Sequence, residues 1–266
     1  ASPLRGVIRI VRKFHESTIT QDIILEKDKP TVDFDTTVDW HEREKVLKAE
    51  FPVDIRSRNA SCEIAHGAAE YPTHYNTSYD QAKFEFCAHK WADLSEGGYG
   101  ASIINDCKYG YNVHDNVMKI TLLRGPILPD PVGDIGMHSF RYSFYPHTGT
   151  WRDADTVRLG FEENIRLDGE FIKANGGSNI GHTFAKIDGD SVILDAVKPA
   201  QDGNGVIVRM YESETRHCTA KAWFDLGYSK VIECNLMECD EHEIPCTNGE
   251  FEFNMKPHEV KTFRLI

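Results

Sequence analysis

Hydrophobic and polar residues alternate with a period of two along much of the chain. In residues 31–42, with the sequence TVDFDTTVDWHE, every second residue from Val32 to Trp40 would lie on one face of an extended strand, and the residues between them would lie on the other. This alternation is typical of a sheet with one buried and one wet face. It recurs in residues 7–12, 84–91, 206–211, 219–224, 251–255 and 260–265.

Turn signals separate several of these segments. Residues 188–190, residues 201–205 and the Asn248-Gly249 pair carry the glycine, asparagine and aspartate that tight turns favour. Many short strands joined by such turns predict a mainly β protein with an antiparallel β-sandwich fold. We expect a large sandwich and a smaller C-terminal β subdomain.

One segment departs from the strand period. Between Trp151 and Ile165 the apolar residues recur every three or four positions, which predicts one short helix near residues 153–165. Gly160, in the middle of this stripe, costs such a helix about 1 kcal/mol relative to alanine. The proline-rich residues 124–138 are predicted to form a long loop, because each proline removes a donor from a strand ladder.

The helix and the glycine-rich residues 174–182 interrupt the strands, so a seam is predicted near residues 146–180. Residues 1–150 would form the main β-sandwich portion. Residues 151–266 would hold the helix, a connecting loop and the terminal strands.

Composition and charge narrow the choice of partners. The chain has 266 residues, a net charge of -12 and a pI near 5.4, which argues against nucleic acid or an anionic membrane as a partner. A neutral or cationic partner fits this charge better, and a sugar is neutral. Seven cysteines at irregular spacing favour a reducing compartment, so a cytoplasmic location is predicted.

Cysteine chemistry is weakly supported by the sequence. Cys234, Cys239, His242 and Cys246 have side chains that bind zinc, but they lack the close C-x2-C spacing of structural zinc sites. Unpaired thiols at a strand end are the favoured interpretation. Cys87 carries no local signature of an activated nucleophile.

Polar and aromatic residues gather in residues 89–111, with the sequence HKWADLSEGGYGASIINDCKYGY. Carboxylates and amides form hydrogen bonds with sugar hydroxyls, and aromatic rings cover the apolar face of a sugar ring, so this segment has the composition of a carbohydrate site. A glycosidase also needs two carboxylates at a set separation. The sequence does not show that any two of these carboxylates face each other.

Three segments carry a family resemblance. Residues 70–111, 122–131 and 134–147 are together similar to the C-terminal β region of glycoside hydrolase family 38 α-mannosidases, and most similar to the bacterial and cytosolic branch. The words HKWADLSE and NDCKYG are long and unusual in composition, which argues against a chance match. Further matches in order extend the resemblance over nearly the whole chain.

The resemblance implies a retaining exo-α-mannosidase that acts on mannosyl oligosaccharides. Its aspartate nucleophile and its zinc ion, held by Asp and His, would lie in an N-terminal catalytic domain and helical bundle that this chain lacks. The chain would then contain no catalytic residue and no metal ligand, and zinc would belong to the full-length enzyme. We therefore expect the isolated chain to be inactive on α-mannosides.

The same resemblance places the NDCKYG segment at the rim of the active site. Some relatives carry consecutive arginines after the aspartate, where this chain has Cys107 and Lys108, so an arginine fork is not expected. The rim candidates, in order of preference, are Asp106, Lys108 and Tyr109, followed by Asp93, Glu96 and His41.

Three hypotheses follow for the function. The chain is the β portion of an α-mannosidase and packs on the N-terminal catalytic domain, or it is a free-standing carbohydrate-binding module, or it is a purely structural sandwich. A binding module would bind mannose alone, whereas a domain taken from a larger enzyme would expose an apolar docking face. The oligomeric state, including a homo-oligomer, stays open.

Overall fold

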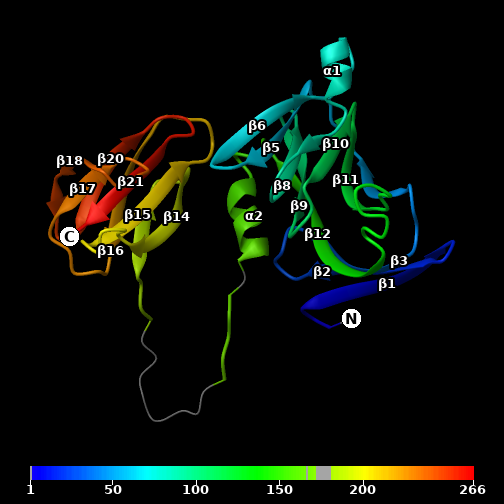
Figure 1. Cartoon of the computed structure of the whole chain (residues 1–266), viewed down its shortest axis with the longest axis horizontal. Helices are drawn as coiled ribbons and strands as arrows, with labels where there is room; N and C mark the ends of the chain where they lie inside the picture. Colours follow the sequence, from blue (N-terminus) through cyan, green and yellow to red (C-terminus); the bar gives the residue numbers. More distant parts are fainter. Residues whose placement is uncertain (1, 166, 172–180) are drawn as a thin grey trace. The chain divides into compact units, whose positions relative to one another are not determined.

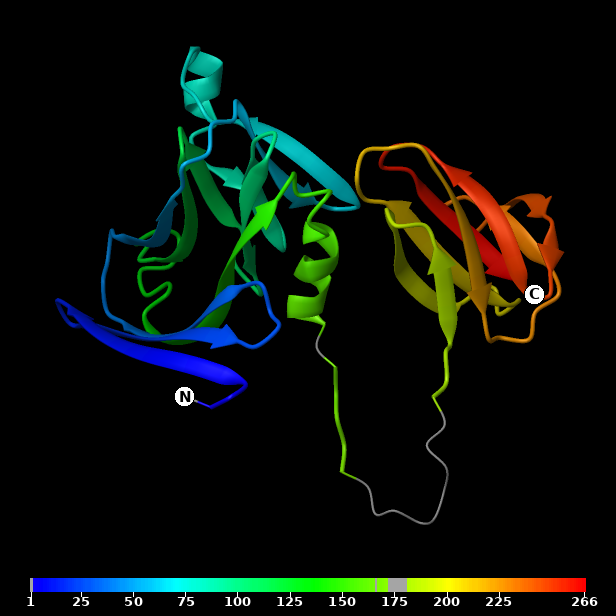
Figure 2. The ribbon, with the colours of Figure 1, turned by 180° about the vertical axis from the view of Figure 1, so that it is seen from behind.

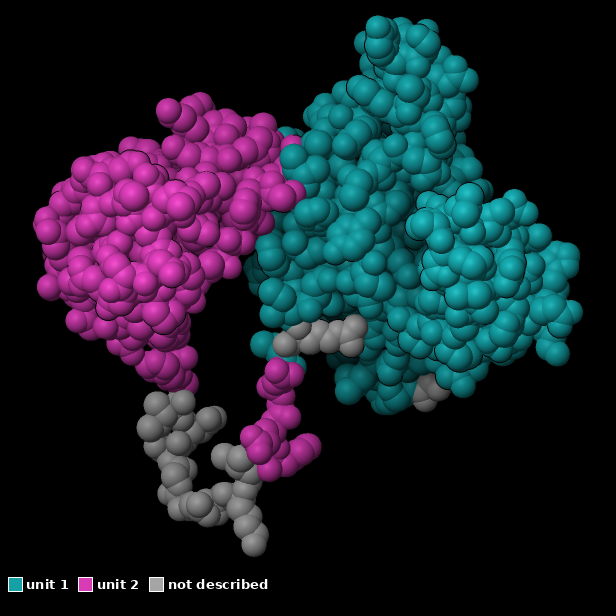
Figure 3. Space-filling view, viewed as in Figure 1, with its two compact units in different colours: residues 1–64, 69–167 teal, residues 65–68, 168–266 magenta. Residues whose placement is uncertain are grey.

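The computed structural model describes residues 2–165, 167–171 and 181–266, and nearly all of its regular structure is antiparallel β-sheet (Figure 1). This confirms the mainly β sandwich expected from the alternating sequence pattern. Residue contacts divide the chain into two compact units (Figure 3). Unit 1 comprises residues 1–64 and 69–167, and unit 2 comprises residues 65–68 and 168–266.

This division groups the helical segment after residue 150 with unit 1. The domain boundary that the sequence suggests between residues 150 and 151 stays a prediction. Most of the glycine-rich stretch at 174–182 lies outside the described residues.

The strands from β1 to β12 form two sheets. The first has eight strands in the order β1-β2-β3-β12-β9-β8-β5-β6, and the second has four in the order β4-β11-β10-β7. Their bounds are β1 Arg5–Phe14, β2 Ser17–Glu26, β3 Val32–Trp40, β4 Val46–Pro52, β5 Asn59–Ile64, β6 Gly67–Pro72, β7 Phe86–Cys87, β8 Trp91–Ser95, β9 Tyr99–Asn105, β10 Gly110–His114, β11 Val117–Arg124 and β12 Gly136–Thr148.

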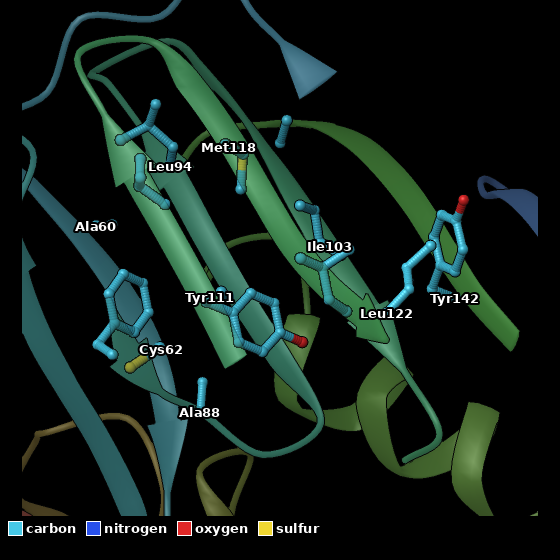
Figure 4. Close-up of a cluster of buried hydrophobic side chains, with 14 of the residues drawn as sticks. Ala60, Cys62, Ala88, Leu94, Ile103, Tyr111, Met118, Leu122 and Tyr142 are labelled. Carbon is cyan, nitrogen blue, oxygen red and sulfur yellow. The ribbon is translucent and has the colours of Figure 1, made fainter. Parts of the chain in front are cut away.

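The core of unit 1 lies between these two sheets. Figure 4 shows Leu94 and Ile103 from the eight-stranded sheet together with Tyr111, Met118 and Leu122 from the four-stranded sheet. All five are 5% exposed or less. Burial of each such side chain stabilises the fold by roughly 1.5–3 kcal/mol, so the inward-facing positions of the alternating pattern provide much of the folding energy.

Residues 84–91, predicted as one strand, instead divide between the two sheets. Strand β7 pairs with β10 in the four-stranded sheet, and β8 pairs with β5 and β9 in the eight-stranded sheet. The chain crosses over at residues 88–90, where Glu63 accepts hydrogen bonds from the backbone N–H groups of His89 and Lys90. The alternation in this segment comes from burial at the crossing and not from a single ladder.

The alternating pattern predicted that every aspartate of β3 lies on a solvent-exposed face. One of these aspartates is buried instead. Asp33 is 1% exposed, because its carboxylate accepts hydrogen bonds from Thr31, Ser143 and Lys29. Burial alone would raise the pKa of Asp33, but these hydrogen bonds outweigh burial and lower it. Lys29 also forms an ion pair with Glu163, which lies near the end of helix α2 (Thr156–Asn164). This end of the helix therefore covers Asp33.

Helix α2 (Thr156–Asn164) confirms the predicted helix, and it lies beside β8 and β9 (Figures 1 and 2). Its Gly160 packs against Trp91, so closely that an added Cβ would lie 3.1 Å from the ring. The ring of Trp91 in turn lies 4.8 Å from that of Trp151. The glycine therefore permits close packing of the helix on the sheet. Ile165, the last residue of the predicted stripe, is 70% exposed.

A second helix, α1 (Ser78–Ala82), was missed by the sequence analysis. It begins with a capping box, in which the Thr77 hydroxyl accepts from the Asp80 N–H and the Asp80 carboxylate accepts from the Thr77 N–H. The Thr-x-x-Asp spacing was a signal that the sequence contained. Within the described ranges, no helix combines the length and apolar character needed to cross a bilayer.

Unit 2 contains two further antiparallel sheets, in the orders β13-β16-β20-β19 and β14-β15-β21-β17-β18. Its own core is built around aromatic residues such as Phe251, Phe253 and Phe263. The bounds of its strands are β13 Ala185–Asp188, β14 Val192–Pro199, β15 Val206–Glu212, β16 Cys218–Phe224, β17 Val231–Cys234, β18 Asp240–Ile244, β19 Cys246–Thr247, β20 Glu250–Met255 and β21 Val260–Leu265.

Two predicted turns have clear physical roles in unit 2. Asn248 and Gly249 join β19 to β20 with φ angles of 53° and 76°, the conformation that a two-residue hairpin turn requires. Asp202, in the 201–205 turn, binds Arg264, which is 3% exposed and also binds Asp240. These carboxylates raise the pKa of Arg264 and so compensate for the burial of its charge.

Strand β1 is an edge of the eight-stranded sheet, and it pairs with β2 without a register shift. Natural sheets usually protect a long edge with bulges, prolines or a covering segment. Strand β1 contains no proline and no bulge, and several of its apolar side chains are exposed. They are Val7, Ile8, Val11 and Phe14, with Leu4 just before the strand.

We expect Gly160→Val to destabilise unit 1 by about 1–3 kcal/mol, because the new side chain would overpack the interface with Trp91. Urea unfolding followed by circular dichroism would measure the loss. Arg158→Ala, an exposed change in the same helix, is the control and should change stability little. Equal stability of Gly160→Val and the parent chain would contradict this account of the glycine.

Candidate functional site

The loop between β9 and β10 carries the three preferred rim candidates. Strand β9 ends at Asn105 and β10 begins at Gly110, so Asp106, Lys108 and Tyr109 lie together in a four-residue connection. The loop passes from the eight-stranded sheet to the four-stranded sheet, and such connecting loops often present binding side chains.

Asn105 fixes the base of this loop. The residue is 4% exposed, and its Nδ2 donates to the carbonyl of His89, at 2.9 Å, and to the Tyr111 hydroxyl. Its Oδ1 accepts from the N–H groups of Cys107, at 2.9 Å, and Lys108. The amide thus turns the backbone directly after β9 and anchors the turn to the core.

Helix α2 and strand β12 hold the loop from two further sides. Asn164 Nδ2 donates to the Asn105 carbonyl at 3.0 Å. The Arg141 N–H donates to Asp106 Oδ2 at 3.1 Å, and the Asp106 N–H donates to the Arg141 carbonyl at 3.3 Å. The position of Asp106 is therefore set by hydrogen bonds to its own backbone and carboxylate, and does not depend on a ligand.

The side chains of Lys108 and Tyr109 each contact a neighbouring aromatic ring. Lys108 Nζ lies 4.3 Å from the centroid of the Phe140 ring, in a cation–π contact. The ring of Tyr109 meets that of His89 edge-on at 5.6 Å, and Tyr109 remains 56% exposed. The loop thus presents an ammonium group, a carboxylate and a phenol to the surface.

A polar cavity of about 410 Å³ adjoins Asp106 on the outer face of the eight-stranded sheet. Its floor includes a row of charged residues that directly oppose one another on successive strands: Arg9, Asp22, Asp35 and Arg141. Each arginine makes two hydrogen bonds to one aspartate, with distances of 2.7 to 3.1 Å. Such bidentate pairs hold their planar groups in fixed orientations.

The remaining rim candidates do not lie with this loop. Asp93 is 1% exposed and accepts hydrogen bonds from Ser102 Oγ, at 2.7 Å, and His147 Nε2, at 2.8 Å, so it belongs to the interior of the unit. Glu96 follows β8 and accepts from the Arg56 N–H at 2.8 Å. It lies at the opposite end of β9 from Asp106, roughly 20 Å away for a strand of this length.

His41 follows β3 and lies apart from the loop as well. Its Nε2 lies 2.8 Å from Asp39 Oδ1, and its N–H donates to the Ser17 hydroxyl at 2.9 Å. It comes six positions after Asp35, the partner of Arg141, which corresponds to roughly 20 Å along a strand. The structure thus brings together three of the six candidates.

Sequence reasoning missed the residues that position the loop. The Asn105 side chain accepts hydrogen bonds from the N–H groups two and three residues later, which is an Asx-type turn. Asparagine favours such turns, so Asn105 was a local signal in the sequence. Arg141 and Asn164 left none, because they lie 36 and 59 residues from Asn105 in the sequence and only the fold brings them to it.

No described residues form a group of three or more His, Cys, Asp and Glu side chains that could hold a metal ion. The cysteines and the histidine of residues 234–246 are included in this statement. Cys234 is buried and bonds to Asp240, while His242 pairs with Glu233 at 3.5 Å. All seven cysteines are free thiols.

The thiol of Cys107, within the loop, has a raised pKa. Burial, together with a hydrogen bond to Asp106 and its negative charge, raises the pKa of the thiol to about 11. The thiol is therefore protonated near neutral pH and is a poor nucleophile.

The fold and this loop define a β-sandwich region that presents polar loop side chains, with no metal-binding cluster among the described residues. Family models agree with this class. Residues 1–132 match the glycosyl hydrolases family 38 C-terminal domain, and residues 191–263 match the glycosyl hydrolases family 38 C-terminal beta sandwich domain. The chain belongs to glycoside hydrolase family 38, as part of its C-terminal region.

Several relatives of this chain are named as α-mannosidases. The chain is 38% identical to alpha-mannosidase G of Dictyostelium discoideum, covering 94% of this chain and 23% of the relative. It is 37% identical to human alpha-mannosidase 2C1, covering 94% and 24%, and 38% identical to an alpha-mannosidase of Saccharomyces cerevisiae, covering 88% and 24%. The chain thus spans about a quarter of the length of these relatives.

A solved structure supports the fold. The crystal structure of an alpha-mannosidase from Enterococcus faecalis superposes with a TM-score of 0.83 at 16% identity, over 100% of this chain and 34% of that one. The family models and the α-mannosidase relatives confirm the recognition of the family from the NDCKYG and HKWADLSE segments.

We expect Asn105→Ala to lower the free energy of unfolding of unit 1 by about 2–4 kcal/mol, because it leaves the buried Tyr111 hydroxyl and several backbone groups without partners. Hydrogen exchange at the Cys107 and Lys108 amides should become faster. Asn59→Ala, which removes an exposed hydrogen bond to Glu70, is the matched control and should cost less than about 0.5 kcal/mol. Unchanged exchange in the loop would contradict the anchoring role.

The rate of alkylation of Cys107 tests the effect of the Asp106 carboxylate on the pKa of this thiol. At pH 8 we expect Cys107 to react about 10-fold more slowly than a thiol with an ordinary pKa of 9.0, and its rate should rise with pH until about 11. Asp106→Asn removes a group that raises this pKa, so the reaction at pH 8 should become faster. Peptide mass spectrometry after iodoacetamide treatment would measure both rates. Asp130→Asn is the control, and an equal acceleration there would contradict the assignment.

Proposed function

We propose that this chain is the C-terminal β region of an α-mannosidase that hydrolyses terminal α-D-mannosyl residues with retention of configuration. The nucleophile would lie in the other three-quarters of a longer protein. Support comes from relatives that are α-mannosidases and of which the chain covers 23–24%. The substrate would be a mannosyl oligosaccharide.

The observation that carries this proposal is the rigid loop that follows Asn105. Its conformation is fixed by hydrogen bonds to Asn164, Arg141 and Tyr111 without any ligand. A preorganised loop can hold polar groups against a substrate without a further entropic cost. The anchoring of this turn by helix α2 and by strands of both sheets supports a role for it in positioning side chains.

Each rim side chain would have a distinct role. The Asp106 carboxylate would accept hydrogen bonds from mannose hydroxyls, and the Lys108 ammonium would donate to hydroxyl oxygens. The exposed face of Tyr109 would pack on the apolar side of a sugar ring. Asp93 would act from the interior, by holding strand β9, and Glu96 and His41 remain candidates for contacts farther from the loop.

The zinc ion that the family resemblance implies does not fit the described residues of this chain. They provide no group of three or more suitable ligand side chains. We propose that the metal, like the nucleophile, binds in the catalytic domain. The chemistry assigned to the present chain is limited to substrate positioning.

Two structural features support the proposed partner and location. The exposed apolar edge of β1 is the kind of surface that a domain of a larger enzyme would cover with its catalytic domain. The seven free thiols suit a reducing cytoplasm. A homo-oligomer would be compatible with the same exposed edge.

A free-standing carbohydrate-binding module is the second candidate, favoured by the 410 Å³ polar cavity next to Asp106. The two proposals differ in what the isolated chain does. A module binds mannose by itself, whereas a rim region contributes only when the catalytic domain completes the site.

We expect Asp106→Asn and Lys108→Met, made in the longer enzyme, each to lower kcat/KM for an aryl α-mannoside by about 10- to 100-fold. Each removes charge-assisted hydrogen bonds worth about 1.5–3 kcal/mol. Asp130→Asn and Lys45→Met, at exposed positions outside the loop, are the matched controls.

Three results would count against the proposal. Unchanged kcat/KM in both loop variants would favour the purely structural sandwich. Turnover of the aryl α-mannoside by the purified 266-residue chain would contradict the absence of a nucleophile. Saturable binding of mannose by the isolated chain would favour the binding module.

A further inference from the structure

A second cavity lies at the other end of β10 from the candidate loop. It has a volume of about 700 Å³ and is lined by residues 54–58, 73–74 and 115–116. The loop 106–109 comes before β10, whereas Asp115 and Asn116 follow it, so the five residues of β10 separate the two sites by roughly 17 Å. The cavity is thus distinct from the proposed sugar rim.

The wall formed by residues 53–58 is irregular but rigidly held. This segment connects β4 to β5, and its backbone bonds to three other segments. Glu96 accepts from the Arg56 N–H at 2.8 Å, and the Tyr99 hydroxyl donates to the Asp54 carbonyl. Asn116 Nδ2 donates to the Val53 carbonyl at 2.6 Å.

Thr73 completes this support from the opposite side. Its hydroxyl donates to the Ser57 carbonyl at 2.6 Å, and its N–H donates to the Arg58 carbonyl at 3.0 Å. The Ile55 side chain is 1% exposed and anchors the segment in the core. A connection held in this way presents its outward side chains from a fixed backbone, as binding loops do.

Two of these outward side chains are the guanidinium groups of Arg56 and Arg58. Other arginines of the chain form ion pairs at 2.7 to 2.9 Å, such as Arg9, Arg141 and Arg264. Among the residues that the structure describes, no carboxylate oxygen lies within 4.0 Å of Arg56 or Arg58, although Asp54 and Asp115 also line the cavity. The cavity thus holds two guanidinium groups that no ion pair within the described part of the chain occupies, beside the two carboxylates of Asp54 and Asp115.

His74 adds an unsatisfied nitrogen to the same wall. Its Nδ1 is buried without a hydrogen-bond partner among the described residues. The Asp80 carboxylate lies 3.6 Å from this atom, which is too long for a hydrogen bond. The Nδ1 atom therefore lies against Asp80, which does not line the cavity, and His74 contributes its ring to the wall.

We propose that this cavity binds a phosphate group, either as the free anion or as part of a phosphorylated sugar. A phosphate carries a charge near -2 at neutral pH and offers several acceptor oxygens. Guanidinium groups match these oxygens through pairs of parallel hydrogen bonds. Arg56 and Arg58 supply the positive charge and the donors.

Calorimetric titration of the 266-residue chain tests this proposal with three probes: inorganic phosphate, mannose 6-phosphate and mannose. Saturable binding of phosphate is expected, and Arg56→Ala and Arg58→Ala should each weaken it about 10-fold or more. Arg56→Lys keeps the charge but loses the paired geometry, so it should bind less tightly than the parent chain. Tighter binding of mannose 6-phosphate than of phosphate would identify a phosphorylated sugar as the ligand, and equal binding would identify the free anion.

Arg124→Ala, an exposed arginine outside the cavity, is the matched control and should not change the affinity. Circular dichroism of each variant confirms that the fold is retained. Absence of saturable binding at millimolar phosphate would overturn the proposal. So would an equal loss in Arg124→Ala, which indicates nonspecific attraction, or acetate binding as tightly as phosphate. None of these results depends on mannosidase activity.

Discussion

The side chain of Asn105 is the interaction on which the geometry of the candidate site depends. One buried amide joins the crossing between the two sheets at His89, the core residue Tyr111 and the backbone of the exposed loop. The carbonyl of the same residue is held by Asn164 on α2. Because an amide has two donors and one acceptor oxygen with two lone pairs, Asn105 uses its full capacity. Aspartate would lose both donors, and leucine would lose every hydrogen bond of the side chain.

Most of the fold could be predicted from the sequence, because a sheet with one buried face imposes period-two alternation on its strands. The exceptions have specific causes. Asp33 has the position of a wet-face residue, yet the end of α2 and Lys29 cover it. The 84–91 segment alternates as one strand, yet it passes from one sheet to the other where Glu63 binds the N–H groups of His89 and Lys90. In both cases a residue distant in the sequence overrides the local pattern.

The candidate site was predicted only in part, and for the same reason. Asp106, Lys108 and Tyr109 are adjacent in the sequence, so one resemblance located all three. Asp93 belongs to the same polar segment, but its pairing with Ser102 and His147 depends on how the strands align, and composition cannot show that alignment. Burial separates residues of one chemical type into different roles, and only the fold determines burial.

The two units have hydrophobic cores with no residue in common. Packing strain in one core is therefore absorbed by its own neighbours, and the effects of substitutions in the two cores should be additive. Over evolutionary time, this independence lets the aromatic core around Phe251 change in volume without requiring compensation around Tyr111. Each half of the chain can thus change its core residues without a matching change in the other half.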